Sequence, residues 1–226
     1  METMEKYYAR RASEYEAIYR KPERQADLAR MQVDIPSLFV DRKVLEIACG
    51  TGYWTPLIAR QAESVVALDY NEETLAIARA KDYPKGNVEF RQGDAYALPA
   101  WPRKFTACYA GFWWSHVPLA RADAFLTGLQ GRLEPGATVA FMDNRYVEGS
   151  STPLSRKDAD GNTYQSRRLA DGSRHEVLKN FPTAQELRER LGRNGRDVRY
   201  VEYEYYWLAT YRITHNARVT SGGGTQ

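Results

Sequence analysis

The stretch VLEIACGTG at residues 44–52 decides the fold, because an apolar strand pattern runs there directly into a glycine loop. Gly50 and Gly52 permit positive φ and a close approach of the backbone to a ligand, and a helical pattern follows at 54–60. Asp69 ends the next apolar run, where a carboxylate accepts hydrogen bonds from ribose hydroxyls. The constellation predicts a site for an adenosine-type ligand. The alternative is a tight turn followed by a simple helix cap.

Short apolar runs alternate with helical patterns along the chain, which is typical of a parallel sheet flanked by helices. One α/β domain is the expectation for 226 residues. Strands are predicted at 43–48, 64–69, 88–92, 105–110 and 138–143. Helices are predicted at 54–60, 72–80 and 120–133, the second with Asn71 as its N-cap.

The flanking segments complete this single domain. Thr183 and Glu186 form a capping-box pattern, which begins a helix to about Leu191, and two antiparallel strands are predicted over 198–212. The predicted organisation is a helical N-terminal cap at 1–40, a cofactor-binding core at 41–143, a polar insert or lid at 144–182, a C-terminal helix with strands at 183–212, and a flexible tail at 213–226. The turn-like pairs Asp160-Gly161 and Asp171-Gly172 make the insert a candidate lid or an inserted hairpin.

The composition is that of an ordinary globular protein, with 43% hydrophobic and 27% charged residues. The net charge of +3 is too small to indicate a nucleic-acid surface by itself. The sequence has neither a long apolar run nor a signal-peptide pattern, so a cytoplasmic location is predicted. Cys49 and Cys108 are expected to be buried free thiols, and no metal-ligand spacing is present.

The glycine loop also discriminates between adenosine cofactors. A dinucleotide site requires a third Gly or Ala at the position of Thr55. That small residue lets the helix after the loop pack close to the sheet, with its N-terminus against a pyrophosphate. Glu46 places negative charge where a pyrophosphate is repelled and a cationic amino-acid group is accepted. Both features disfavour a nicotinamide-dependent oxidoreductase.

Residues 46–52 resemble motif I of the class I S-adenosylmethionine-dependent methyltransferases. Asp69 is similar to the ribose-binding acid of that family, and 93–95 to its adenine-contacting segment, while Ala48 stands where the family usually has a first glycine. The resemblance covers about 40–143 and implies a Rossmann-like α/β fold: a seven-stranded, mostly parallel sheet with helices on both faces and the last strand antiparallel. The cofactor-binding residues it implies are Glu46, Ala48, Gly50, Gly52, Tyr53, Asp69, Tyr70, Asp94, Ala95 and Gly111.

Aromatic residues mark the expected substrate side of the same edge. The fourth strand continues into a crowded aromatic run with a single titratable residue, His116, which is the candidate general base. Tyr8 and other tyrosines near the N-terminus offer a second aromatic surface. The alternative for each aromatic residue is core packing, and for His116 a local hydrogen bond. The predicted substrate-binding residues are Tyr7, Tyr15, Tyr19, Trp113 and Trp114.

The predicted function is therefore an S-adenosylmethionine-dependent N- or O-methyltransferase that acts on a small, planar aromatic or heterocyclic metabolite. An RNA methyltransferase needs a basic groove or an appended RNA-binding module, and neither is evident in the sequence. A non-catalytic cofactor-binding subunit stays open, because binding motifs do not prove turnover. The expected partner is a small molecule, with neither nucleic acid nor membrane, and the oligomeric state is left open.

Overall fold

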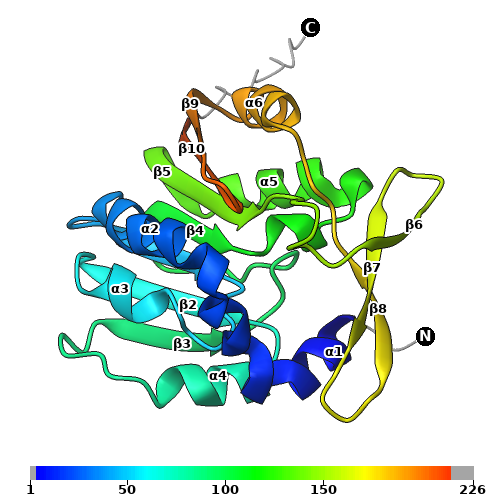
Figure 1. Ribbon diagram of the computed structural model, residues 1–226. Coiled ribbons are helices and arrows are strands. Elements are labelled where there is room, and N and C mark those ends of the chain that lie inside the picture. The colour runs from blue at the N-terminus through cyan, green and yellow to red at the C-terminus, as the bar shows by residue number, and fades with distance from the viewer. Residues whose placement is uncertain (1–3, 215–226) are drawn as a thin grey trace, which may run out of the picture.

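The computed structural model describes residues 4–214 and has a seven-stranded sheet at its centre, in the order β3-β2-β1-β4-β5-β10-β9 (Figure 1). The bounds are β1 Lys43–Ile47, β2 Ser64–Asp69, β3 Val88–Gln92, β4 Phe105–Gly111, β5 Leu133–Asn144, β9 Gly195–Glu202 and β10 Tyr206–Ile213. The first five strands pair in parallel, and β10 runs antiparallel to both β5 and β9. The Rossmann-like fold predicted from the sequence is confirmed.

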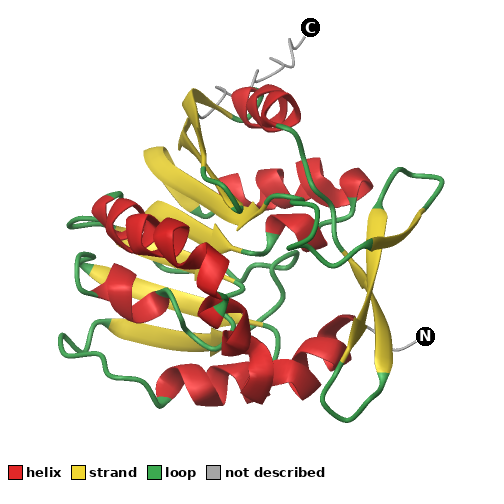
Figure 2. Ribbon diagram, in the orientation of Figure 1, coloured by secondary structure: helices red, strands yellow, loops and turns green. Residues whose placement is uncertain are grey.

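Helices cover both faces of this sheet because successive strand residues point to opposite sides (Figure 2). On one face, Val44 joins a core cluster with Met31 of α2 and Ile58 of α3. On the other face, Leu45 joins a cluster with Leu126 of α5, and α6 packs there too. The helix bounds are α1 Met4–Arg11, α2 Gln25–Ser37, α3 Thr55–Ala59, α4 Glu72–Arg79, α5 Ala122–Gln130 and α6 Ala184–Gly192.

Local differences from the sequence prediction have clear causes. The capping box of Thr183 and Glu186 is present at α6, but the side chain of Asn71 makes no capping hydrogen bond at α4. The predicted helix at 120–133 ends earlier, because β5 already begins at Leu133, which pairs with Phe105. Ile213 still belongs to β10, so the predicted tail begins too early, and its residues 215–226 lie outside the described chain.

The polar insert forms a separate three-stranded antiparallel sheet, with β6 Leu154–Lys157, β7 Thr163–Arg168 and β8 Arg174–Leu178 (Figure 1). It stands beside the carboxyl ends of the parallel strands. Helix α1 packs on β8 through a small cluster of Tyr7, Leu169 and Val177. The long 3₁₀ helix η1, Ala12–Arg20, continues from α1 along this edge and contacts α4. The N-terminal segment and the insert thus enclose the edge where ligands bind in such sheets.

Within residues 4–214, no helix combines the length and the apolar character that a membrane crossing requires. Cys49 and Cys108 are buried free cysteines, as predicted.

Gly50 and Gly52 are required in the loop for different structural reasons. Gly50 has φ +57° and Gly52 has φ +72°, a left-handed conformation that side chains with a Cβ resist. A Cβ at Gly50 meets nothing within 4 Å, whereas one at Gly52 lies 2.9 Å from the Ala78 Cβ of α4. Gly52 therefore lets the loop pack against α4, and its predicted contact with a cofactor stays a prediction.

This difference predicts unequal effects of two matched substitutions. Gly50→Ala is expected to lower the free energy of unfolding by about 1–2 kcal/mol, the cost of a left-handed residue with a Cβ. Gly52→Ala is expected to lower it further, because the methyl group also displaces α4. Urea unfolding of both variants without ligand measures the difference, and equal losses would contradict the packing role of Gly52.

Candidate active site

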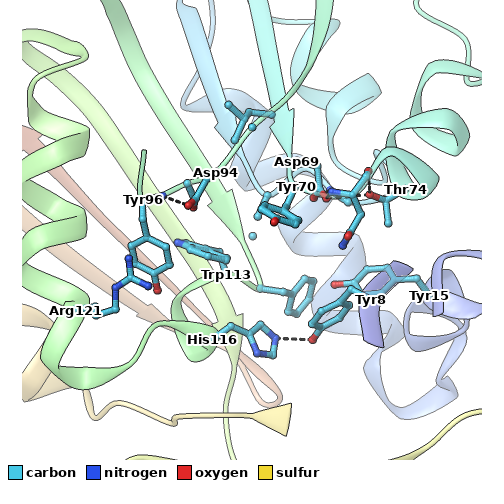
Figure 3. Close-up of a pocket in the computed structure, with 18 residues that line it drawn as sticks. Tyr8, Tyr15, Asp69, Tyr70, Thr74, Asp94, Tyr96, Trp113, His116 and Arg121 are labelled. Atoms are coloured by element: carbon cyan, nitrogen blue, oxygen red, sulfur yellow. Dashed lines mark hydrogen bonds between the residues drawn. The ribbon is translucent and has the colours of Figure 1, made fainter. Parts of the chain in front are cut away.

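One pocket lies at the carboxyl ends of β1, β2 and β4, and we call it the β1–β4 pocket (Figure 3). In open α/β sheets this is where the strand order reverses and ligands bind. Seven of the predicted cofactor-binding residues line it: Ala48, Gly50, Asp69, Tyr70, Asp94, Ala95 and Gly111. Ala48, at the position of the usual first glycine, has φ +52°, so the backbone keeps the conformation that favours glycine there.

Asp69 ties the glycine loop to the end of β2. Its Oδ2 accepts a hydrogen bond from the Gly50 amide at 2.8 Å. Its Oδ1 accepts bonds from the Asn71 amide and the Thr74 hydroxyl, both at 2.9 Å. Burial raises the pKa of Asp69, and these hydrogen bonds act against the rise by favouring the carboxylate. The carboxylate thus shapes the pocket and also lines it.

A small recess continues the β1–β4 pocket inward, and Glu46, Tyr19 and Tyr53 line it together with the glycine loop. The rings of Tyr19 and Tyr53 stack with their centroids 3.5 Å apart. Glu46 is buried, and its Oε2 has no hydrogen-bond partner among the described residues. Burial raises the pKa of Glu46 to about 8. An unpartnered buried carboxyl oxygen of this kind is suited to a cationic group.

The opposite end of the β1–β4 pocket is aromatic. Asp94 Oδ1 accepts the Tyr96 amide at 2.8 Å, so Asp94 both forms a local turn and lines the pocket. The Arg121 guanidinium lies 3.5 Å from the Tyr96 ring centroid, and Trp113 lines the same end (Figure 3). This end presents flat rings, the Asp94 carboxylate and the Arg121 guanidinium, and the rings and the carboxylate suit a planar heterocycle with an amino group.

A second pocket adjoins the first, and we call it the basic pocket. Its lining brings together residues from α1, the N-terminal 3₁₀ turns, β7 and the segment after β8. No Asp or Glu of the described chain lines it. The cationic side chains in its lining are Arg11, Lys21, Arg24, Arg167, Arg168 and Lys179.

Lys179 is held by a buried ion pair. Its Nζ lies 2.8 Å from Asp143 Oδ1 on β5 and 2.6 Å from Ser115 Oγ, and both charged side chains are almost fully buried. Burial lowers the pKa of Lys179 to about 8, while Asp143 acts in the opposite direction. The Ser115 amide also donates to Asp143 Oδ2, so the turn after β4 is fixed to the end of β5.

Four residues line both pockets and form the junction between them: Tyr8, Tyr15, Phe112 and His116. Phe112 has φ +57°, an uncommon conformation for a bulky residue, and its amide donates to the Met142 carbonyl at 2.7 Å. A strained backbone conformation of this kind persists only where the surrounding structure holds it, and at Phe112 it places an aromatic ring at the junction.

His116, the predicted base, has both ring nitrogens in hydrogen bonds. Nδ1 lies 2.7 Å from the Leu178 carbonyl oxygen, and Nε2 lies 2.7 Å from Tyr8 Oη (Figure 3). Burial holds the pKa of His116 well below its usual range, and the positive charge of Lys179 acts in the same direction. The imidazole is therefore neutral at physiological pH.

The structure distributes the predicted substrate residues unequally. Tyr15 and Trp113 line the β1–β4 pocket, Tyr7 lines the basic pocket and Tyr19 lines the inner recess. Trp114 instead packs in the core, with its ring centroid 5.0 Å from that of Phe141, and lines neither the β1–β4 pocket nor the basic pocket. The short 3₁₀ turn at Trp114–His116 directs the two neighbouring indoles into different environments.

Sequence reasoning missed the basic pocket. Arg11, Arg24, Arg167 and Lys179 are distant in the sequence, and only the fold gathers them. The one available signal was the density of Arg and Lys within the polar insert, including the adjacent Arg167 and Arg168.

Comparison with known proteins agrees with this geometry. The family described as "Methyltransferase domain" matches residues 44–136. The chain is 33% identical over 128 residues to 2-phytyl-1,4-naphtoquinone methyltransferase of Thermosynechococcus vestitus, covering 54% of this chain and 55% of that protein. It is 36% identical over 111 residues to demethylmenaquinone methyltransferase of Lactococcus lactis, covering 46% and 42%. The chain thus spans about half the length of these curated relatives.

Among solved structures, the DhpI complex with SAH is similar over nearly the whole chain. It is 31% identical with a TM-score of 0.75, and the match covers 92% of this chain and 94% of DhpI. A DhpI complex described as DhpI-SAM-HEP gives a TM-score of 0.74 at 29% identity, with coverage of 93% and 99%. Together with the fold and the glycine-loop pocket, this likeness shows that the chain belongs to the class I S-adenosylmethionine-dependent methyltransferases.

Proposed function

We propose that the protein transfers the methyl group of S-adenosylmethionine to an anionic oxygen of a small acceptor held in the basic pocket. The observation that carries the proposal is that this pocket adjoins the β1–β4 pocket through four shared residues, and that its lining has six cationic side chains and no carboxylate within the described chain. Charge-assisted hydrogen bonds from Arg and Lys are the interactions that hold oxyanions.

The residues of the β1–β4 pocket and its recess fit the cofactor. Asp69 suits ribose hydroxyls, and the space beside Gly50 is open to a ligand. Glu46 Oε2, buried and unpartnered, suits the ammonium of an amino-acid group. We assign adenine binding to the end of the pocket that has Asp94, Ala95 and Tyr96.

When bound, S-adenosylmethionine supplies a sulfonium methyl group that an oxyanion takes with its own lone pair, leaving a methylated oxygen, a neutral thioether and no proton. Because the acceptor is already deprotonated, the protein has to supply orientation and exclusion of water. Arg167 and Lys179 orient the acceptor, and the rings of Tyr15 and Phe112 exclude water at the junction. A neutral nitrogen acceptor fits this pocket less well, because it offers the six cations no negative charge for a charge-assisted hydrogen bond.

The aromatic lining of the basic pocket narrows the acceptor further. Tyr7, Phe112 and Phe181 stand among the cations, and flat rings stack on such side chains. The quinone methyltransferases among the curated relatives are also named for ring substrates. An acidic aromatic or heterocyclic metabolite combines both features. A neutral planar acceptor is the second candidate, favoured by the same rings.

Labelled cofactor tests the acceptor class directly. With S-adenosylmethionine carrying a labelled methyl group, we expect transfer to small carboxylates, phosphates or phosphonates, detected by mass spectrometry as methyl esters. A matched panel of neutral aromatic compounds is the control and is expected to remain unlabelled. Transfer to the neutral panel alone would contradict the anionic acceptor, and binding of cofactor without any transfer would indicate a non-catalytic subunit.

The role of Asp69 is tested by cofactor affinity. Asp69→Ala is expected to weaken S-adenosylmethionine binding by about 1–3 kcal/mol, the range for hydrogen-bonding groups left without a partner. Glu73→Ala, which removes an exposed carboxylate from the first turn of α4, is the matched control and should bind as the wild type does. Calorimetry measures both. Unaltered affinity for S-adenosylmethionine in a folded Asp69→Ala protein would mean that Asp69 supports the glycine loop but does not bind the cofactor.

The role of the basic pocket is tested with Arg167. Arg167→Gln removes a charge that no carboxylate of the described residues pairs with, and it should lower kcat/KM for the acceptor by roughly 10- to 150-fold, corresponding to one charge-assisted hydrogen bond. Cofactor affinity should not change. Arg174→Gln, on the exposed side of β8, is the control. Equal effects of the two substitutions would contradict the assignment of the pocket.

A further inference from the structure

The hydrogen bonds of His116 determine its tautomer. A carbonyl oxygen only accepts, so the 2.7 Å contact with Leu178 requires a proton on Nδ1. The neutral ring then has a lone pair on Nε2, which accepts a hydrogen bond from the Tyr8 hydroxyl at 2.7 Å. Both nitrogens are used inside the protein, and neither is available to a ligand unless Tyr8 moves away.

Tyr8 is left with oxygen lone pairs and no free proton. Its hydroxyl hydrogen is directed to His116, and among the groups that the structure describes none donates a hydrogen bond to Tyr8 Oη. Tyr8 lines both pockets and so stands at the junction (Figure 3). A hydroxyl fixed in this way attracts positive charge and repels an oxyanion.

We propose that His116 is a positioning residue, whose neutral imidazole fixes the Tyr8 hydroxyl so that Tyr8 Oη presents only lone pairs to the sulfonium methyl group of the bound cofactor. This proposal rests on the proposed function, which makes S-adenosylmethionine the methyl donor. The methyl hydrogens of a sulfonium carry partial positive charge and form weak C–H···O contacts. The cations of the basic pocket hold the acceptor on the other side of the junction. The positively charged sulfonium therefore faces oxygen lone pairs, and the anionic acceptor faces cations.

The charges around His116 agree with a neutral, non-basic imidazole. Lys179 and Arg167 disfavour the imidazolium, Asp143 favours it, and burial outweighs Asp143, so the pKa of His116 lies well below its usual range. A general base that takes up a proton beside two cations would work against this environment. An anionic acceptor has no proton to give up.

The first test requires no turnover. In the wild-type protein without ligands, NMR of labelled histidines, with the His116 signals assigned through His116→Gln, should show the Nδ1-protonated neutral ring between about pH 5.5 and 8. The Nε2-protonated form, or titration near the unperturbed value of about 6.5, would overturn the proposal. This result does not depend on which acceptor is methylated, so it separates the proposal from the acceptor assignment.

The second test measures the preference for S-adenosylmethionine over its demethylated product by calorimetry. Tyr8→Phe and His116→Ala should each reduce this preference about two- to fivefold, the effect of one C–H···O contact. His116→Gln should restore most of it, because the amide oxygen can accept from Tyr8 while the amide hydrogen reaches Leu178. A glutamine cannot act as a base, so His116→Gln should also recover the turnover that His116→Ala loses. Equal defects in the Gln and Ala variants, or an unchanged preference in Tyr8→Phe, would overturn the positioning role.

Discussion

The buried ion pair between Lys179 and Asp143 is the interaction on which the site depends. Asp143 lies near the end of β5 in the central sheet, and Lys179 follows the last strand of the insert, so the pair joins the two sheets of the molecule. Removing two charges from water is costly, and a buried pair is weak evidence for stability. Its more direct consequence is geometric. The Ser115 amide donates a hydrogen bond to Asp143, and the Ser115 hydroxyl accepts one from Lys179. The Asn180 amide donates to the Ser115 carbonyl. These bonds hold Ser115 in place and thereby fix the position of His116, the next residue in the chain.

The central fold could be predicted from the sequence because its signals are local. The strand and glycine loop at 44–52 and the acid at Asp69 each form within one supersecondary unit, where backbone conformation and residue type agree. The errors lie where tertiary contacts compete with propensity. Leu133 follows an amphipathic helix and fits its pattern, but pairing with Phe105 draws it into β5. The insert has no periodic apolar pattern from which strand pairing can be inferred, but its two Asp-Gly pairs favour a hairpin. Both pairs lie in the turns that join β6 to β7 and β7 to β8, while the third strand was not predicted.

The two pockets differ in the same way, because one follows from local sequence signals and the other from tertiary contacts. The residues that line the β1–β4 pocket come mostly from segments that follow strand ends, and sequence order is enough to bring such segments to one edge. The basic pocket instead depends on how α1 and the insert pack across that edge, with Tyr7 and Val177 in contact. Charged residues spread over separate elements carry no spacing signal. The net charge of +3 gives no sign of this local concentration of cations, because it sums the charged residues of the whole chain.

The two pockets also differ in the sign of their charge, and this difference explains the neutral junction. Asp69 and Asp94 line the cofactor side, with Glu46 in its recess and one cation, Arg121, beside Tyr96. Carboxyl groups therefore outnumber cations there, which suits a cationic donor, whereas the charged residues that line the basic pocket are all cations. A charged group at the junction would favour one reactant and repel the other. Neutral rings and a neutral imidazole avoid this conflict, and the burial that lowers the pKa of His116 keeps it neutral. If the acceptor is the anion that we propose, its charge and that of the sulfonium attract each other across a region of low dielectric constant, where the attraction is stronger than in water.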